Sequence, residues 1–238
     1  MVDSEVSRWW RELNANSDAA RGYETLVSSL AMLSARKPLA SLLVTSVQPE
    51  EGKTTVAMNL SLTMARAGRN VLVLDADLRR SRVHQIVGVD RAPGFAELLA
   101  GAAGVLDVIR TVKVPGGPAG SSETLSVITS GQPSSTSFLA LGTPTVKEII
   151  AATASRYDLV IVDAPPVFAV NDPQLLAPAV DGVILVLATG RVSERDAARA
   201  KAQIVDSGGH VIGVVMNRFE EQVHGPGVHP YSSYYDPR

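Results

Sequence analysis

One stretch decides the fold of this 238-residue chain: Ser41-Leu-Leu-Val-Thr-Ser-Val-Gln-Pro-Glu-Glu-Gly-Lys-Thr-Thr-Val-Ala57. An apolar run ends abruptly, turns through Pro49 and Gly52, and restarts with the pattern of a helix. Such a turn directs the free backbone N–H groups and the positive dipole end of the helix at one point, where a polyphosphate can bind. The stretch therefore predicts a phosphate-binding loop, in which Lys53 reaches the β- and γ-phosphates and Thr54 binds Mg²⁺.

The loop departs from the strict phosphate-loop pattern in two places. The pattern asks for a glycine five positions before Gly52, and this chain has Val47 there. Glu50 adds a carboxylate, which phosphate repels unless the side chain points outward, and a residue other than glycine restricts positive φ. Taken alone, the turn also fits an ordinary strand-to-helix corner with an exposed lysine.

Two further apolar runs end in aspartate. The run that starts at residue 70 ends in Asp75, with Asp77 beyond it, and the run that starts at residue 157 ends in Asp163, followed by Pro165 and Pro166. In an open parallel sheet, ligands bind at the carboxyl ends of the strands, so these carboxylates converge on the phosphate loop. Mg²⁺ needs oxygen ligands at that place. One such aspartate could be a turn-former or a helix cap, but three favour a shared nucleotide site.

Strand-like and helix-like segments alternate along the chain. The strand-like runs are mostly Val, Ile and Leu without polar alternation, which is typical of strands covered on both faces. The pattern predicts an α/β domain of the P-loop NTPase type, with a parallel sheet flanked by helices on both faces. The expected strands span about 42–46, 71–75, 125–129, 158–162, 183–188 and 211–216, and the expected helices 53–67, 145–155, 171–179 and 194–207.

The chain divides into three expected parts: an N-terminal extension over residues 1–19, an ATPase or kinase domain over residues 20–222, and a flexible C-terminal tail over residues 223–238. Within the domain, residues 20–34 place apolar side chains on one helical stripe, which packs either on its own sheet or on a neighbour. The Gly/Pro-rich segment Val112–Ser126 is expected to be a flexible surface loop.

The tail carries three clustered tyrosines, Tyr231, Tyr234 and Tyr235, among Gly, Pro and Ser residues. A segment so poor in aliphatic residues cannot build a core, so the tyrosines need another reason for being there. Phosphorylation would add about −1.5 to −2 charges to each of them. We therefore expect the acidic strand ends to repel a phosphorylated tail.

The composition argues against several classes of protein. The chain has no cysteine, so it holds no disulfide framework and no thiolate metal site, which suits a reducing cytoplasm. No run approaches the roughly 20 apolar residues of a membrane span, and the start shows no export signal. The net charge of −2 gives no support to nucleic-acid binding.

Together these motifs resemble those of the bacterial tyrosine kinases of capsule and exopolysaccharide synthesis, a branch of the P-loop ATPases related to partition and division-site ATPases. The family's Pro-x-x-Gly-Lys-Thr loop matches Pro49–Thr54, its Asp-x-Asp-x-Arg strand end matches Asp75–Arg79, and its Asp-x-x-Pro strand end matches Asp163–Pro166. A tyrosine-rich C-terminus completes the pattern. Gln48 replaces the signature lysine of the partition-type relatives, which favours the kinase branch.

The resemblance implies ATP and Mg²⁺ as cofactors and a role for each motif residue. Asp75 would be the general base for the acceptor phenol, which an unperturbed pKa near 10 keeps protonated at neutral pH. Asp77 and Asp163, with Thr54, would hold Mg²⁺ and its waters, and Lys53 would neutralise charge on the transferring phosphoryl group. The implied phosphoacceptors are Tyr231, Tyr234 and Tyr235, and the implied nucleotide-binding residues are Gln48, Pro49, Glu50, Glu51, Gly52, Lys53, Thr54, Thr55 and Asn217.

Two local interpretations stay open at this point. Asn217 follows a strand and either contacts the adenine, as the resemblance implies, or caps the strand end. Arg79, Arg80 and Arg82 could meet phosphate or a neighbouring subunit, although a run of arginines is more often a solvated face.

The resemblance also implies partners. These are a membrane-embedded polysaccharide co-polymerase that acts as activator and holds the kinase at the inner face of the membrane, and a cognate tyrosine phosphatase. The chain would be either a free-standing kinase or a cytoplasmic fragment of a longer protein. The family's N-terminal helix usually carries Glu-x-x-Arg-x-x-Arg between subunits of a ring, and this chain has Arg21, Glu24 and Val27, so self-association lacks the ring motif.

Two other classes of function share the same residues. One is an ATPase switch in which nucleotide state governs assembly on a partner, without kinase activity. The other is a catalytically weak adaptor, which Glu50 and the missing ring motif would suit. The tyrosine cluster favours the kinase, because a switch has no need of it.

Overall fold

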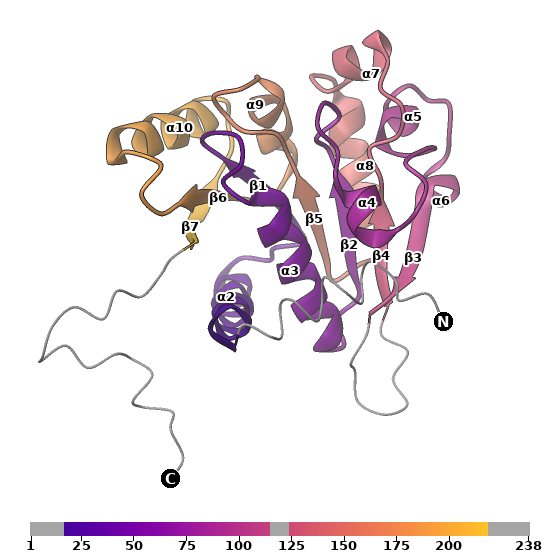
Figure 1. The fold of residues 1–238 in the computed structure, drawn as a ribbon. Helices are drawn as coiled ribbons and strands as arrows, with labels where there is room; N and C mark the ends of the chain where they lie inside the picture. Colours follow the sequence, from indigo (N-terminus) through magenta and orange to yellow (C-terminus); the bar gives the residue numbers. More distant parts are fainter. Residues whose placement is uncertain (1–16, 115–123, 219–238) are drawn as a thin grey trace, which may run out of the picture.

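The computed structural model describes residues 17–114 and 124–218, which form a seven-stranded sheet with helices on both faces (Figure 1). The strands are β1 (Ser41–Ser46), β2 (Val71–Asp75), β3 (Ile109–Lys113), β4 (Thr124–Ile128), β5 (Leu159–Asp163), β6 (Gly182–Ala188) and β7 (Val211–Asn217). Their order in the sheet is β3-β4-β2-β5-β1-β6-β7, and only the β3–β4 pair is antiparallel. The expected α/β fold of the P-loop NTPase type is confirmed.

The three central strands explain why the apolar runs predicted this sheet. Every residue of β1, β2 and β5 is buried, as expected for parallel strands covered by helices on both sides. In the β2–β5 pairing, Asp75 lies directly opposite Asp163. The register therefore places two of the three expected carboxylates side by side at the carboxyl edge of the sheet.

Three helices cover one face of the sheet: α2 (Ser17–Arg36), α3 (Lys53–Arg66) and α4 (Val83–Val87). The helix α2 lies beside α3 (Figure 1), and its Leu30 is buried, with Tyr23, Leu26 and Val27 packed against the same core. The apolar stripe thus packs on the chain's own domain, and the helix begins three residues before the expected start at residue 20.

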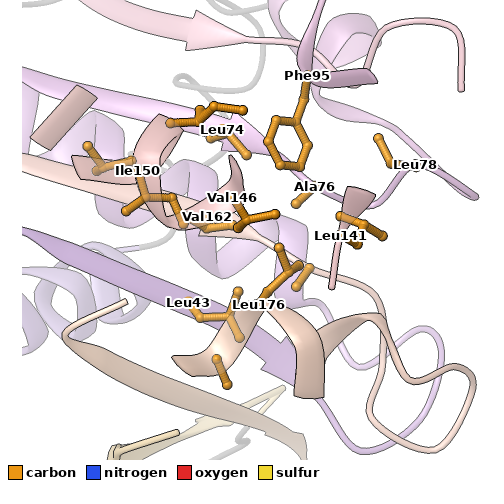
Figure 2. Close-up of a cluster of buried hydrophobic side chains, with 14 of the residues drawn as sticks. Leu43, Leu74, Ala76, Leu78, Phe95, Leu141, Val146, Ile150, Val162 and Leu176 are labelled. Carbon is orange, nitrogen blue, oxygen red and sulfur yellow. The ribbon is translucent and has the colours of Figure 1, made fainter. Parts of the chain in front are cut away.

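The other face carries the remaining helices. They are α5 (Phe95–Leu99), α6 (Val105–Val108), α7 (Ser135–Ala140), α8 (Pro144–Ala154), α9 (Asp172–Leu176), the 3₁₀ helix η1 (Ala177–Ala179) and α10 (Glu194–Asp206). Figure 2 shows part of the core on this side, where Phe95 and Val146 from the helices meet Leu74 and Val162 from the strands. Each strand contributes alternate side chains to the two cores, because successive residues of a strand point to opposite faces.

Three expectations about local structure were wrong. The segment Val112–Ser126 is not a loop throughout, because its two ends belong to β3 and β4; residues 115–123 lie outside the described part. The edge strand β3 was not expected, since its sequence Ile-Arg-Thr-Val-Lys is only partly buried and lacks a long apolar run. The helix expected over 171–179 is split into α9 and η1 around Pro178, which has no N–H to continue an α-helix.

Several expectations fall on residues that the structure does not describe. The three tail tyrosines lie there, as does most of the proposed N-terminal extension. Among the described helices, none is both long and apolar enough to cross a membrane.

Candidate active site

A cleft of about 730 Å³ opens where the central strands end. The phosphate loop forms one wall, and the segments that follow β2 and β5 form the others. From the loop, the lining residues are Pro49, Glu50, Gly52, Lys53, Thr54 and Thr55. The cleft thus combines the predicted phosphate loop with the two strand ends that carry the expected carboxylates.

Gly52 precedes the first turn of α3 and has the backbone angle φ of 91°, which glycine adopts without strain. A Cβ atom at this position would collide with the side-chain amide of Asn217. No side chain caps the helix, so its first N–H groups stay free for an anion. Tertiary contact and backbone conformation therefore both require glycine here.

Glu51 stabilises the phosphate loop through hydrogen bonds. Its side chain is buried, and its carboxylate accepts hydrogen bonds from the backbone N–H of Gln48 (2.8 Å) and of Ala188 in β6 (3.4 Å). The Asn217 side-chain amide donates to the Glu51 carbonyl oxygen (2.8 Å). These bonds tie the phosphate loop to the ends of β6 and β7.

The structure places the expected nucleotide-binding residues in two groups. The side chains of Glu51 and Asn217 are committed to the loop itself, and neither residue lines the cleft; nor does Gln48. Of the two interpretations of Asn217, the structure favours the structural one, because its amide supports the loop at the end of β7. The remaining loop residues of the set do line the cleft.

Glu50 takes a conformation that was not expected of it. Its φ is 66°, in the left-handed region that costs a residue with a Cβ about 1–2 kcal/mol. The residue is exposed and is among those that line the cleft.

Lys53 is held by the strand-end carboxylates. Its Nζ lies 2.8 Å from Oδ2 of Asp77 and 3.7 Å from Oδ1 of Asp163, and it donates to the Thr54 hydroxyl (3.2 Å). Burial by itself would lower the pKa of Lys53, but Asp163 and Asp77 outweigh it and raise that pKa. The lysine therefore stays protonated at the point where phosphate would enter.

Asp163 and Thr54 form the second part of the site. The Thr54 hydroxyl donates to Oδ2 of Asp163 (2.7 Å), while the buried Oδ1 has no hydrogen-bond partner in the described structure. Burial raises the pKa of Asp163, against the opposing effect of Lys53. A buried acceptor without a donor, beside a threonine hydroxyl, fits a water bound to Mg²⁺.

Direct coordination by protein carboxylates alone does not fit the described residues. They contain no group of three or more His, Asp or Glu side chains placed to hold a metal ion. Magnesium at this place would therefore keep waters and take phosphate oxygens as ligands, which is its usual behaviour in nucleotide sites. Thr54, Asp77 and Asp163 are the residues that could hold it.

Asp75 lies one layer deeper. It is completely buried, and its carboxylate accepts hydrogen bonds from the Ser81 hydroxyl (2.7 Å) and from the backbone N–H groups of Asp77 (3.2 Å) and Val83 (3.3 Å). Burial, followed by repulsion from Asp163, raises the pKa of Asp75 to about 7. Sequence reasoning missed Ser81, since a serine six residues beyond a strand gives no local signal of this contact.

The three arginines after β2 do not share one environment. The Arg79 guanidinium makes two hydrogen bonds to the Asp172 carboxylate (3.0 and 3.3 Å) and lies 4.6 Å from the centre of the Phe138 ring. Arg80 and Arg82 are exposed and line the cleft. Arg79 is likewise exposed and lines the cleft, as a solvated face requires, and its pair with Asp172 also joins the β2–α4 segment to α9.

The fold and this site define a class of nucleotide-binding protein. Residues 42–231 match the family model described as the CobQ/CobB/MinD/ParA nucleotide binding domain, and the chain belongs to that family. Its fold is also that of the septum site-determining protein MinD of Pyrococcus horikoshii, solved with Mg-ADP, at a TM-score of 0.63 and 22% identity over 77% of this chain and 72% of that chain.

Closer relatives narrow the class to tyrosine kinases. The chain is 31% identical to tyrosine-protein kinase YwqD of Bacillus subtilis over 195 residues, which cover 82% of this chain and 79% of YwqD. It is 33% identical to tyrosine-protein kinase CpsD of Streptococcus pneumoniae serotype 4, over 78% of each chain. The kinase domain of the Escherichia coli tyrosine kinase ETK superposes with a TM-score of 0.80 at 26% identity, covering 92% of this chain and 84% of the solved kinase-domain chain. The chain is a member of this family of bacterial tyrosine-protein kinases, as its motifs indicated.

Proposed function

We propose that this tyrosine kinase transfers the γ-phosphoryl group of ATP to the clustered tyrosines of its own C-terminal segment, Tyr231, Tyr234 and Tyr235. The observation that carries the proposal is the group formed by Lys53, Thr54 and Asp163 at the phosphate loop, in which a buried Asp163 oxygen lacks a donor. A cation and an open acceptor at this position suit a nucleotide with its metal ion.

The transfer needs few groups from the protein. The phenolic oxygen of the acceptor attacks the γ-phosphorus, the bond from that phosphorus to the β,γ-bridging oxygen breaks, and ADP leaves. Lys53, which the structure holds protonated, neutralises charge on the phosphoryl oxygens. When bound through Thr54, Asp77 and Asp163, Mg²⁺ supplies further neutralisation of the phosphates.

Asp75 is our candidate for the group that accepts the phenolic proton. A pKa of about 7 suits a general base at neutral pH, because such a carboxylate is basic enough to take a proton and still partly ionised. Asp77 lines the cleft and donates its backbone N–H to Asp75, so it connects this buried carboxylate to the cleft in which the acceptor would bind. Substitution of each aspartate in turn would show whether that residue acts as the base or belongs to the metal site.

The wider role follows the family. We propose that the kinase regulates synthesis or export of a capsular or extracellular polysaccharide, that a membrane-embedded co-polymerase activates it and holds it at the inner face of the membrane, and that a tyrosine phosphatase reverses the reaction. In the putative tyrosine-protein kinase EpsB of Ralstonia solanacearum, 35% identical, the matching region is 24% of the protein.

One experiment tests the proposed reaction. The purified chain is incubated with Mg²⁺ and ATP, and phosphotyrosine is mapped by mass spectrometry, alongside Lys53→Met and a variant with Tyr231, Tyr234 and Tyr235 all changed to Phe. We expect phosphate on the tail of the wild type and none on Lys53→Met. ATP hydrolysis without any phosphotyrosine, in the presence of a co-expressed activator, would instead indicate an ATPase switch.

A further inference from the structure

The charge of the cleft differs from the charge of the strand ends beneath it. Asp75 and Asp163 are buried and do not line the cleft. The charged residues that line it are the cations Lys53, Arg79, Arg80, Arg82 and Arg218 and the anions Glu50 and Asp77. We expected acidic strand ends to repel a phosphorylated tail. That expectation is wrong about the surface that the tail would meet, because most of the charged side chains there are cations.

Ion pairs within the protein neutralise some of these cations and leave two others without a partner. Lys53 is paired with Asp77, and Arg79 with Asp172. In the part of the chain that the structure describes, the guanidinium groups of Arg80 and Arg82 have neither an ion pair nor a hydrogen bond, although the Arg80 backbone N–H donates to Oδ1 of Asp77 (2.9 Å). Two unpaired cations thus lie within five residues after the cleft carboxylate Asp77 in sequence.

The walls beside these arginines suit an aromatic ring. Ile86, Pro165, Pro166, Ala169 and Val170 line the cleft with apolar surface. A phenol ring can pack on such a surface with its hydroxyl directed at Asp77 and the phosphate loop. The residues on either side of an acceptor tyrosine would then pass the β2–α4 segment, which carries Arg80 and Arg82.

We propose that Arg80 and Arg82 make this kinase select acceptor tyrosines that have an anionic group, carboxylate or phosphate, on a neighbouring residue. The inference rests on the proposed tyrosine phosphotransfer and adds its sequence specificity. Arginine suits the task because its planar guanidinium pairs with carboxylate and with phosphate through two parallel hydrogen bonds.

Before any phosphorylation, the tail contains one tyrosine with an acidic residue beside it. From Gln222 to the C-terminus the only acidic residue is Asp236, which directly follows Tyr235. Tyr235 is therefore the first acceptor. Its phosphate then provides the neighbouring anion for Tyr234, and Tyr231, three residues further from the growing charge, follows last.

Peptide binding tests the specificity without requiring turnover. The probes are peptides of residues 227–238: unmodified, with Asp236→Asn, and with phosphate on Tyr235. Affinities are measured with the full chain, Mg²⁺ and a non-hydrolysable ATP analogue, for wild type, the double variant Arg80→Gln/Arg82→Gln, and Arg195→Gln, an exposed arginine of α10, as matched control. We expect wild type and control to bind the unmodified and phosphorylated peptides about three- to tenfold more tightly than the Asn peptide, as for partly exposed charge pairs, and the double variant to lose this preference.

Two readouts complete the test. In a time course of autophosphorylation, phosphate should reach Tyr235 first, and Asp236→Asn should abolish that order. A double variant that keeps the peptide preference but binds ATP tenfold more weakly would overturn the proposal, because the arginines would then contact the nucleotide. Equal affinity of wild type for all three peptides would overturn it as well. A charge preference in binding without phosphate transfer would instead contradict the proposed reaction and leave the recognition intact.

Discussion

The Nζ atom of Lys53 lies 2.8 Å from Oδ2 of Asp77, so the cation that the loop offers to phosphate is already held by a carboxylate of the cleft. A nucleotide must draw Lys53 from this pair. The exchange replaces one anionic partner by another, which keeps the buried ammonium compensated throughout.

Lys53→Met should lower phosphotransfer by about 100-fold or more, because no other lysine of residues 17–114 and 124–218 lines the cleft to neutralise the phosphoryl oxygens. The fold should persist, with native circular dichroism. Lys37→Met, at an exposed lysine beyond α2, is the matched control and should behave as wild type. Near-normal turnover of Lys53→Met would show that the phosphate-loop assignment is wrong.

Asp75→Asn should lower the rate of phosphotransfer far more than the affinity for ATP. The reason is that a base acts only once the phenol is in place, whereas the nucleotide does not contact the buried Asp75 side chain. Initial rates of phosphotyrosine formation and equilibrium ATP binding check this. Equal losses in both would make Asp75 part of the metal site.

The raised pKa of Asp75 also predicts a pH dependence of stability. The folded value is about 7 and the ordinary value 3.8, so between these limits the native state binds more protons than the unfolded state. The free energy of unfolding should therefore fall as pH rises from about 4 to 7, by an amount on the order of 2–4 kcal/mol, and level off above. Urea unfolding without Mg²⁺ or nucleotide, at pH 5 and pH 8, measures it. Asp75→Asn should show a clearly smaller decline, and an equal decline would assign the effect to other groups.

Substitution of the two adjacent glutamates should affect the free energy of unfolding to different extents. Glu51→Ala leaves the partly buried N–H of Gln48 and the buried N–H of Ala188 without their acceptor, so we expect a loss of about 1–3 kcal/mol in unfolding free energy and weaker ATP binding. Glu50→Ala, at the exposed rim, should change stability by less than about 1 kcal/mol. For Glu50→Gln, we expect a modest change in ATP affinity; a gain of tenfold, about 1.4 kcal/mol, would show that the charge faces the phosphates.

Gly52→Ala should disrupt the phosphate loop, because the new Cβ meets the Asn217 amide and the residue has positive φ. In Gly52→Ala/Asn217→Ala the collision is relieved while the backbone strain stays, so ATP affinity should recover in part. Isothermal titration of both variants and of Asn217→Ala alone checks this. No recovery in the double variant would mean that strain, and not the collision, dominates.

Local pattern was sufficient for the architecture and for placing Lys53, Thr54 and Asp77 around one cleft, with Asp163 beneath it. Long apolar runs identify strands buried on both faces, and strand ends of a parallel sheet must meet at one edge. The pattern failed for β3 and for the short helices α4 to α7, which are four to six residues long and too brief to show a period.

The sequence by itself thus determined which strand ends and which loop form the site. Only the tertiary structure decided which of their side chains face the ligand, because that depends on contacts between distant residues. Asn217 reaches Glu51 across 166 positions, and Arg79 reaches Asp172 across 93, and the local sequence around each residue gives no sign of either contact. Arg80 and Arg82 line the cleft for the same reason, because no residue elsewhere in the described fold forms an ion pair or a hydrogen bond with their guanidinium groups.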